Sequence, residues 1–274
     1  GLVPPASFIP VAEESGFIEA IGEWVLVAAC RQIQAWRAAG LGDIKVAVNL
    51  SARQLRRPNL LDEIRRILGE TGVDQCPWLL ELELTESMVM HDIERNVVIM
   101  RRLREMGLLL SIDDFGTGYS SLSYLQRAPF DKIKIDRSFV SGATRKGSRN
   151  GAIIASIVSL AEALGMETTA EGVETLDELD LVRDLGCSHV QGYIYEKPLT
   201  APAASERLAA GLQAIASGPR SARASRQTML RCVVLENGGQ DSDATIRNIS
   251  STGALVEGLW NVPTGKIPRH ATVP

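Results

Sequence analysis

Residues 80–87 form the stretch LELELTES, in which leucines alternate with polar residues. Successive side chains of a β-strand point to opposite faces, so the leucines share one face and the first two glutamates and the threonine share the other. The stretch DKIKID at residues 131–136 repeats this pattern, with isoleucines opposite lysines. Both stretches predict strands that have one apolar and one charged face.

Outward from these two stretches, β-rich runs alternate with helical patterns along the chain. Strict alternation over roughly 200 residues predicts an α/β fold with a parallel sheet and helices outside, either a barrel or an open doubly wound sheet. Strands are expected at residues 45–50, 79–85, 108–113, 132–135, 168–170 and 189–191, and helices at 21–39, 60–68, 92–106, 121–126, 152–164 and 176–185.

Polar residues stand at or near the C-terminal end of six successive predicted strands. An open sheet gathers its ligands at one switch point on two or three strands. Polar groups on six strands converge only where the sheet closes, so the sequence predicts a (β/α) barrel of the TIM type. These residues are Asn49, Glu83, Asp113, Lys134, Glu171 and Gln191.

Two adjacent carboxylates, Asp113 and Asp114, follow an apolar strand and precede the glycine-rich segment FGTGYSS. Such neighbours repel each other and lose hydration unless a positive group lies between them. Instead of belonging to a site, the two aspartates could form an ordinary Asx turn. Lys134 could likewise be a lysine at the barrel rim whose ammonium reaches solvent. Each residue taken alone has such a structural explanation. Six polar residues at matching positions on successive strands are less easily explained in this way, so together they favour a functional site.

The candidate ligands are all oxygen donors, without histidine or cysteine. Hard oxygen ligands select Mg²⁺ or Mn²⁺ over zinc or copper. Four carboxylates exceed what one such ion takes, so two ions sharing Asp113 or Asp114 are expected. A close metal pair suits the attack of water on a phosphodiester. The ligand set is Asn49, Glu83, Asp113, Asp114 and Glu171.

Six motifs follow one another in this region: VNLSARQL (48–55), ELTES (83–87), DDFGTGYSSLSYL (113–125), KIDRSFV (134–140), AEGVET (170–175) and QGYIYEKP (191–198). They resemble the motifs of the EAL family of bacterial cyclic di-GMP phosphodiesterases. They occur in the order of that family, and the resemblance covers residues 1 to about 213.

The resemblance implies a barrel enzyme that hydrolyses cyclic di-GMP to linear pGpG with two Mg²⁺ or Mn²⁺ ions. The five oxygen donors then correspond to metal ligands. Lys134 corresponds to the residue that orients or activates the attacking water, and nearby metals would lower its pKa. Glu86 corresponds to the residue that holds the loop after Asp114, and Gln191 and Glu174 would line the site.

The signature Glu-Ala-Leu that gives the family its name would lie just before Gly1. We therefore expect an N-terminally incomplete barrel that lacks one metal-binding glutamate. On this expectation the parent protein hydrolyses cyclic di-GMP, whereas the 274-residue chain alone is marginally folded, self-associates and is inactive.

A second segment is expected after the barrel domain at residues 1–213 and a basic linker at 214–227. Within residues 228–274, the stretch RNISSTGALVEG resembles the N-x-S-x-x-G signature of PilZ domains, which bind cyclic di-GMP. The resemblance implies that Asn248, Ser250 and Gly253 would bind the nucleotide. The paired arginines of that family are not found. We therefore expect a partial, β-rich PilZ-like module.

The overall composition excludes several classes of protein. A net charge of −4 gives no indication of a basic surface that would bind a nucleic-acid polymer. No apolar run approaches the length of a membrane span, and no signal-peptide pattern is present. Four scattered cysteines indicate reduced thiols in the cytoplasm. A second copy of the chain and an upstream sensory or GGDEF domain are the candidate partners.

The main alternative to the enzyme is a receptor that binds cyclic di-GMP without cleaving it and signals through the PilZ-like module. The presence of Asp113 and Lys134 favours the enzyme, because degenerate receptors usually lose such residues. A structural barrel without metals is disfavoured by the repulsion among its carboxylates.

Overall fold

The computed structural model describes residues 3–117, 122–145 and 147–211, and four strands between residues 227 and 272. The chain divides into two compact units, Gly1–Ser217 and Gly218–Pro274. The linker predicted from the sequence lies almost wholly outside the described residues.

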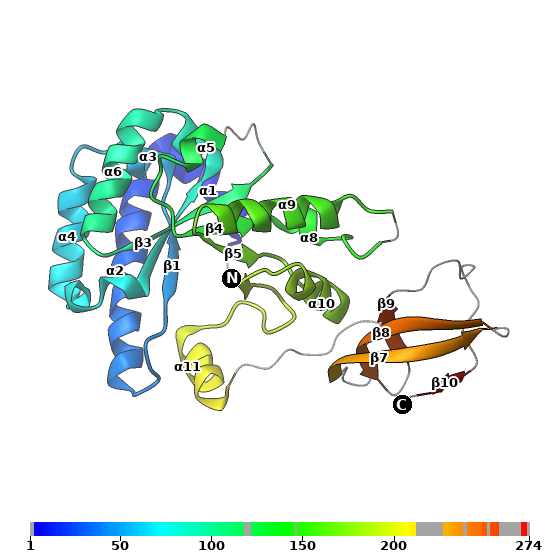
Figure 1. Ribbon diagram of the computed structural model, residues 1–274. Coiled ribbons are helices and arrows are strands. Elements are labelled where there is room, and N and C mark those ends of the chain that lie inside the picture. The colour runs from blue at the N-terminus through cyan, green and yellow to red at the C-terminus, as the bar shows by residue number, and fades with distance from the viewer. Residues whose placement is uncertain are drawn as a thin grey trace. The chain divides into compact units, whose positions relative to one another are not determined.

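The first unit is built on a parallel sheet whose strand order follows the chain, from β1 to β6 (Figure 1). The predicted α/β alternation and parallel sheet are confirmed. Within the described residues the sheet is open, with β1 and β6 at its two edges, so it forms a half-barrel rather than a closed barrel. The strands are β1 Val46–Asn49, β2 Leu80–Thr85, β3 Leu109–Phe115, β4 Lys132–Ile135, β5 Glu167–Ala170 and β6 His189–Val190.

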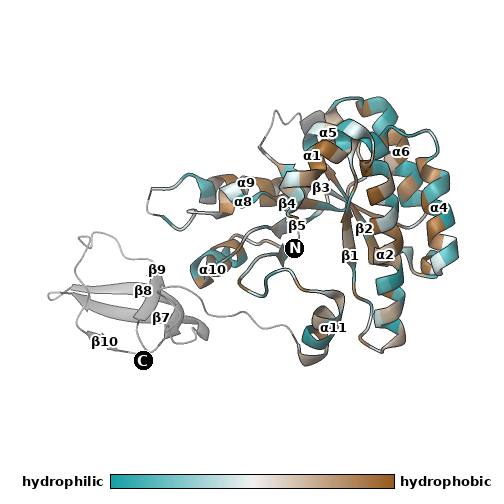
Figure 2. Ribbon diagram, turned by 180° about the vertical axis from the view of Figure 1, so that it is seen from behind, coloured by the Kyte–Doolittle hydropathy of each residue, from teal (hydrophilic) through white to brown (hydrophobic). Residues whose placement is uncertain are grey.

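Helices connect the strands and bury one face of the sheet. The leucines of β2 and the isoleucines of β4 are completely buried in a single apolar core. Hydrophilic residues lie along the outer surfaces of α4 and α6 (Figure 2). The helices are α1 Pro5–Ser15, α2 Ile18–Ala38, α3 Ala52–Leu55, α4 Leu60–Thr71, α5 Glu86–Met90, α6 Ile93–Glu105, α7 Leu122–Leu125, α8 Arg137–Val140, α9 Asn150–Ala163, α10 Leu176–Asp184 and α11 Ala201–Ala210, with 3₁₀ turns at Val73–Gln75 and Pro77–Leu79.

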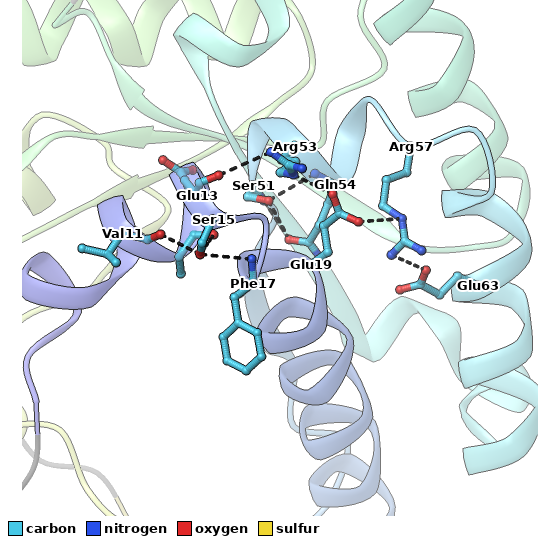
Figure 3. Close-up of polar contacts among 11 residues, drawn as sticks. Val11, Glu13, Ser15, Phe17, Glu19, Ser51, Arg53, Gln54, Arg57 and Glu63 are labelled. Carbon is cyan, nitrogen blue, oxygen red and sulfur yellow. Dashed lines mark hydrogen bonds and ion pairs between the residues drawn. The ribbon is translucent and has the colours of Figure 1, made fainter.

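Ion pairs anchor the segment that follows β1. The Arg53 guanidinium donates to Glu19 at 2.7 Å, and Arg57 bridges Glu19 at 3.4 Å and Glu63 at 2.7 Å (Figure 3). The Ser51 side chain caps α3 by accepting the N–H of Gln54 at 3.2 Å. These contacts tie α3 to α2 and α4, and so restrain the end of β1 next to the candidate ligand Asn49.

The turn after β6 packs closely against the backbone that follows β5. A Cβ atom on Gly192 would collide with the backbone of Val173, whose carbonyl accepts the N–H of Ile194 at 3.0 Å. Gly192→Ala is therefore expected to lower the free energy of unfolding by about 1–3 kcal/mol. Urea denaturation measures this change.

A glycine in open space provides the control for that substitution. Gly151 lies in α9 with no atom near the position of a Cβ. Gly151→Ala is expected to raise the free energy of unfolding by about 0.5–1 kcal/mol, because alanine loses less backbone entropy in a helix. Equal effects of the two substitutions would show that the turn tolerates a side chain.

The second unit contains a four-stranded antiparallel sheet of order β10-β7-β8-β9. Asn248 pairs with Leu255, and Ser250 pairs with Gly253, in the register of β8 and β9. The side chains of the predicted nucleotide ligands Asn248 and Ser250 lie outside what the structure describes. The strands are β7 Gln227–Asn237, β8 Gln240–Ser250, β9 Gly253–Glu257 and β10 His270–Thr272.

None of the helices in the described part of the chain is long and apolar enough to cross a bilayer.

Candidate active site

A buried lysine stands at the centre of the candidate site. The Nζ atom of Lys134 lies 2.7 Å from Oε1 of Glu83, 2.7 Å from Oε1 of Glu171 and 3.4 Å from Oδ1 of Asp113. These side chains come from four neighbouring strands or their ends, because parallel strands bring their C-terminal ends to one edge. One ammonium faces three carboxylates, so the cluster carries an excess of negative charge.

A bulge in β3 explains why two aspartates can occur side by side. Ile112 pairs with Ile133 and Phe115 pairs with Ile135, so Asp113 and Asp114 together oppose the single residue Lys134. Asp114 has a φ of 56°, a left-handed conformation that aspartate tolerates better than most residues. Its N–H donates to Oδ1 of Asp113 at 3.0 Å. The bulge therefore places two adjacent aspartates at the register position of one lysine, and the Asp113 carboxylate contacts that lysine.

The charges of the cluster act on one another through a largely buried environment. Burial raises the pKa values of Glu83 and Glu171, and the Lys134 ammonium only partly offsets this effect. Burial alone would lower the pKa of Lys134, but the two glutamates reverse this and raise it above its ordinary value.

Asp114 also carries an unfavourable charge. Its partial burial raises the pKa of its carboxyl, and the neighbouring charges of Asp113 and Asp136 raise it further. The positive charge of Lys134 lowers the pKa of Asp114, but this effect is smaller than the effects that raise it. The carboxylates of the bulge are therefore short of positive charge even with the lysine in place.

Glu86 contacts the backbone at the end of the bulge. It begins α5, and its side chain is buried. Its Oε2 accepts the N–H of Gly116 at 3.1 Å. This bond ties the turn after Asp114 to the end of the neighbouring strand β2.

The remaining predicted residues lie at the same edge of the sheet. Asn49 ends β1, is exposed, and pairs in register with Glu83. Gln191 follows β6 and donates its N–H to the carbonyl of Ala170 at 2.9 Å. Glu174 lies 3.8 Å from the Arg137 guanidinium. All the predicted residues of the first unit therefore lie on the end of the sheet that carries Lys134.

A groove of about 820 Å³ brings several of these residues together. Glu171, Glu174 and Gln191 line it, as do Tyr193 and Tyr195. The two tyrosines were not predicted as site residues from the sequence, although the aromatic residues in the motif QGYIYEKP were a usable signal. A groove of this size can hold a drug-sized ligand or a dinucleotide.

The donor set fits hard divalent cations in its chemistry and charge. Every donor is an oxygen, and the carboxylates outnumber the one ammonium among them. Across residues 3–117, 122–145 and 147–211, no three acidic, histidine or cysteine side chains converge on a preformed metal cage. The carboxylates of Glu83, Asp113 and Glu171 instead gather around Lys134.

Comparison with known sequences gives consistent matches over the first unit. A family model described as EAL domain matches residues 1–198. The Pseudomonas aeruginosa protein named cyclic di-GMP phosphodiesterase NbdA is 43% identical over 210 residues, which are 77% of this chain and 26% of that protein. The chain thus spans about a quarter of the length of this curated relative.

Comparison with solved structures gives the same result. The PaMucR phosphodiesterase in complex with c-di-GMP superposes with a TM-score of 0.71 at 43% identity, covering 74% of this chain and 81% of that one. Klebsiella pneumoniae BlrP1, solved with manganese and cy-diGMP, has a TM-score of 0.63 at 31% identity, covering 73% of this chain and 50% of that one.

Proposed function

The chain belongs to the EAL domain family, and from this premise we propose that the protein that carries it hydrolyses cyclic di-GMP to linear pGpG. The cluster of Lys134 with Glu83, Asp113 and Glu171 is the observation that carries the proposal. A relative named as a cyclic di-GMP phosphodiesterase supports the same substrate. The activity of the 274-residue chain by itself stays a prediction.

Mg²⁺ or Mn²⁺, held by Asn49, Glu83, Asp113, Asp114 and Glu171, would supply positive charge at the phosphodiester and lower the pKa of a bound water. Lys134 contributes a fixed ammonium at the point where negative charge grows during attack. Its hydrogen bonds to Glu83 and Glu171 orient both carboxylates. Glu86 holds the backbone after the bulge through Gly116.

The groove that Glu171 lines suits a guanine dinucleotide. Tyr193 and Tyr195 offer aromatic faces on which bases can stack. The Watson–Crick edge of guanine has two donor groups, and a carboxylate such as Glu174 can accept a hydrogen bond from each. We therefore assign Glu174 and Gln191 to substrate binding.

A receptor that binds cyclic di-GMP without cleaving it is the alternative. Incubation of the protein with Mn²⁺ and cyclic di-GMP, followed by chromatography, separates the two functions. The enzyme yields linear pGpG in amounts far above the protein concentration. The receptor returns cyclic di-GMP unchanged.

Asp114→Asn tests the excess negative charge of the bulge. Asparagine keeps the left-handed backbone conformation but removes one repelling charge. Because Asp114 is largely exposed, the metal-free protein is expected to gain at most about 1 kcal/mol in free energy of unfolding. The stabilisation that Mn²⁺ adds should become smaller. Thermal unfolding with and without Mn²⁺ measures both changes, and an unchanged response to Mn²⁺ would remove Asp114 from the ligand set.

We also propose that residues 228–274 form a PilZ-like module that binds the same nucleotide through Asn248, Ser250 and Gly253. The antiparallel sheet of the second unit is compatible with this proposal. Asn248→Ala is expected to weaken nucleotide binding by the second unit about tenfold, since one hydrogen bond is lost. Calorimetry on a chain whose first site carries Glu171→Gln measures this, and unchanged binding would refute the assignment.

Self-association, an upstream sensory or GGDEF domain and a cytoplasmic location stay predictions.

A further inference from the structure

The carboxylate of Glu86 has too few hydrogen bonds for a buried charge. Its side chain is 4% exposed, and only its Oε2 has a partner, the N–H of Gly116. Its Oε1 is buried and has no hydrogen-bond partner among the described residues. A carboxylate accepts about four hydrogen bonds in water, so its burial with one donor is costly.

The hydroxyl of Tyr124 also makes no hydrogen bond of good geometry. Tyr124 lies in α7, is 1% exposed, and its hydroxyl has no hydrogen-bond partner within the described part of the chain. Buried tyrosine hydroxyls usually find one. Burial raises the pKa of the Tyr124 phenol, and the negative charge of Glu86 and hydrogen bonding to its side chain raise it further. The hydroxyl and the carboxylate therefore face each other, although no hydrogen bond of good geometry joins them.

We propose that Tyr124 is a positioning residue whose hydroxyl donates a hydrogen bond to Oε1 of Glu86. This bond would satisfy both unpaired atoms at once. One carboxylate would then hold Gly116, which follows the aspartate bulge, and also α7. The bulge that carries Asp113 and Asp114 would thereby be fixed relative to Glu83 on β2. The effect on turnover rests on the proposed function, whereas the hydrogen bond itself does not.

Hydrogen exchange at the amide of Gly116 tests the bond without metal or nucleotide. Tyr124→Phe removes only the hydroxyl and should speed this exchange about tenfold, the value of one bond to a charged group. Glu86→Gln should speed it at least as much. If the hydroxyl acts through Glu86, the double variant exchanges no faster than Glu86→Gln alone. The proposal would be overturned if the accelerations of the two single variants multiplied in the double variant. It would also be overturned if the Gly116 amide of Tyr124→Phe exchanged at the wild-type rate.

Ser111→Ala is the matched control. Ser111 lies in β3, is fully buried, and has a hydroxyl without a partner among the described residues, so the substitution also removes a buried hydroxyl. Exchange at Gly116 should stay at the wild-type rate in this variant. A similar acceleration would assign the effect to general loosening of the core and would refute the role of Tyr124.

A second readout links the bond to the active site. Tyr124→Phe should raise the Mn²⁺ concentration needed for half-maximal hydrolysis several-fold, because the bulge is held less firmly. If the exchange results appear as expected but no hydrolysis occurs in the wild type, the hydrogen bond stands and the proposed function fails. Accelerated exchange with an unchanged Mn²⁺ requirement would overturn the positioning role.

Discussion

Replacing Lys134 with methionine is expected to reduce the rate of cyclic di-GMP hydrolysis by about 100- to 10,000-fold. Methionine keeps most of the side-chain volume but removes the ammonium from the centre of Glu83, Asp113 and Glu171. The loss should fall on kcat, with the affinity for nucleotide largely retained. Steady-state kinetics and calorimetry measure the two quantities separately. Lost affinity with an unchanged rate would make Lys134 a binding residue.

Lys132 on the same strand provides a matched control. Its Nζ pairs with Oε2 of Glu81 at 2.6 Å, and both side chains are nearly buried. Breaking either buried ion pair is expected to cost about 3–5 kcal/mol of folding free energy. Lys132→Met should therefore resemble Lys134→Met in stability but retain most of its kcat. Because Lys132 also lines the substrate groove, any further loss should fall on KM. Equal losses of turnover would attribute the effect of Lys134 to folding alone.

Removal of divalent cations is expected to abolish hydrolysis entirely. The site offers only oxygen donors, and its carboxylates outnumber its one ammonium, so cations are needed to neutralise the cluster and the substrate phosphate. Turnover should vanish in EDTA and return on addition of excess Mg²⁺ or Mn²⁺. Thermal unfolding in the same buffers distinguishes loss of catalysis from loss of folding. Undiminished turnover in EDTA would refute the metal site.

The strands of the first unit were predictable because their local pattern agrees with their environment. The alternation in β2 correctly separated its leucines from its glutamates. It could not show that Glu81 and Glu83 are themselves buried, because their burial depends on lysines two strands away. Helix α1 was missed because its prolines, including the internal Pro10, disguise the helical pattern.

The positive group beside Asp113 also needed the structure. Metal ions were expected in this role from the sequence, and the structure adds Lys134, whose Nζ lies 3.4 Å from Oδ1 of Asp113. That contact depends on the register between β3 and β4 and on the bulge that interrupts it. Neither feature follows from a local sequence pattern. For the same reason, the contact between Glu86 and Gly116 could be expected only from family resemblance.

Hydrolysis in water enriched in the heavy oxygen isotope tests the central claim most directly. The protein, Mn²⁺ and cyclic di-GMP are incubated in this water, and the nucleotides are analysed by mass spectrometry. If the Lys134 cluster directs water at the phosphodiester, linear pGpG forms over many turnovers and carries one heavy oxygen on its new terminal phosphate. Recovery of unlabelled cyclic di-GMP, bound in proportion to the protein, would contradict the account and identify a receptor.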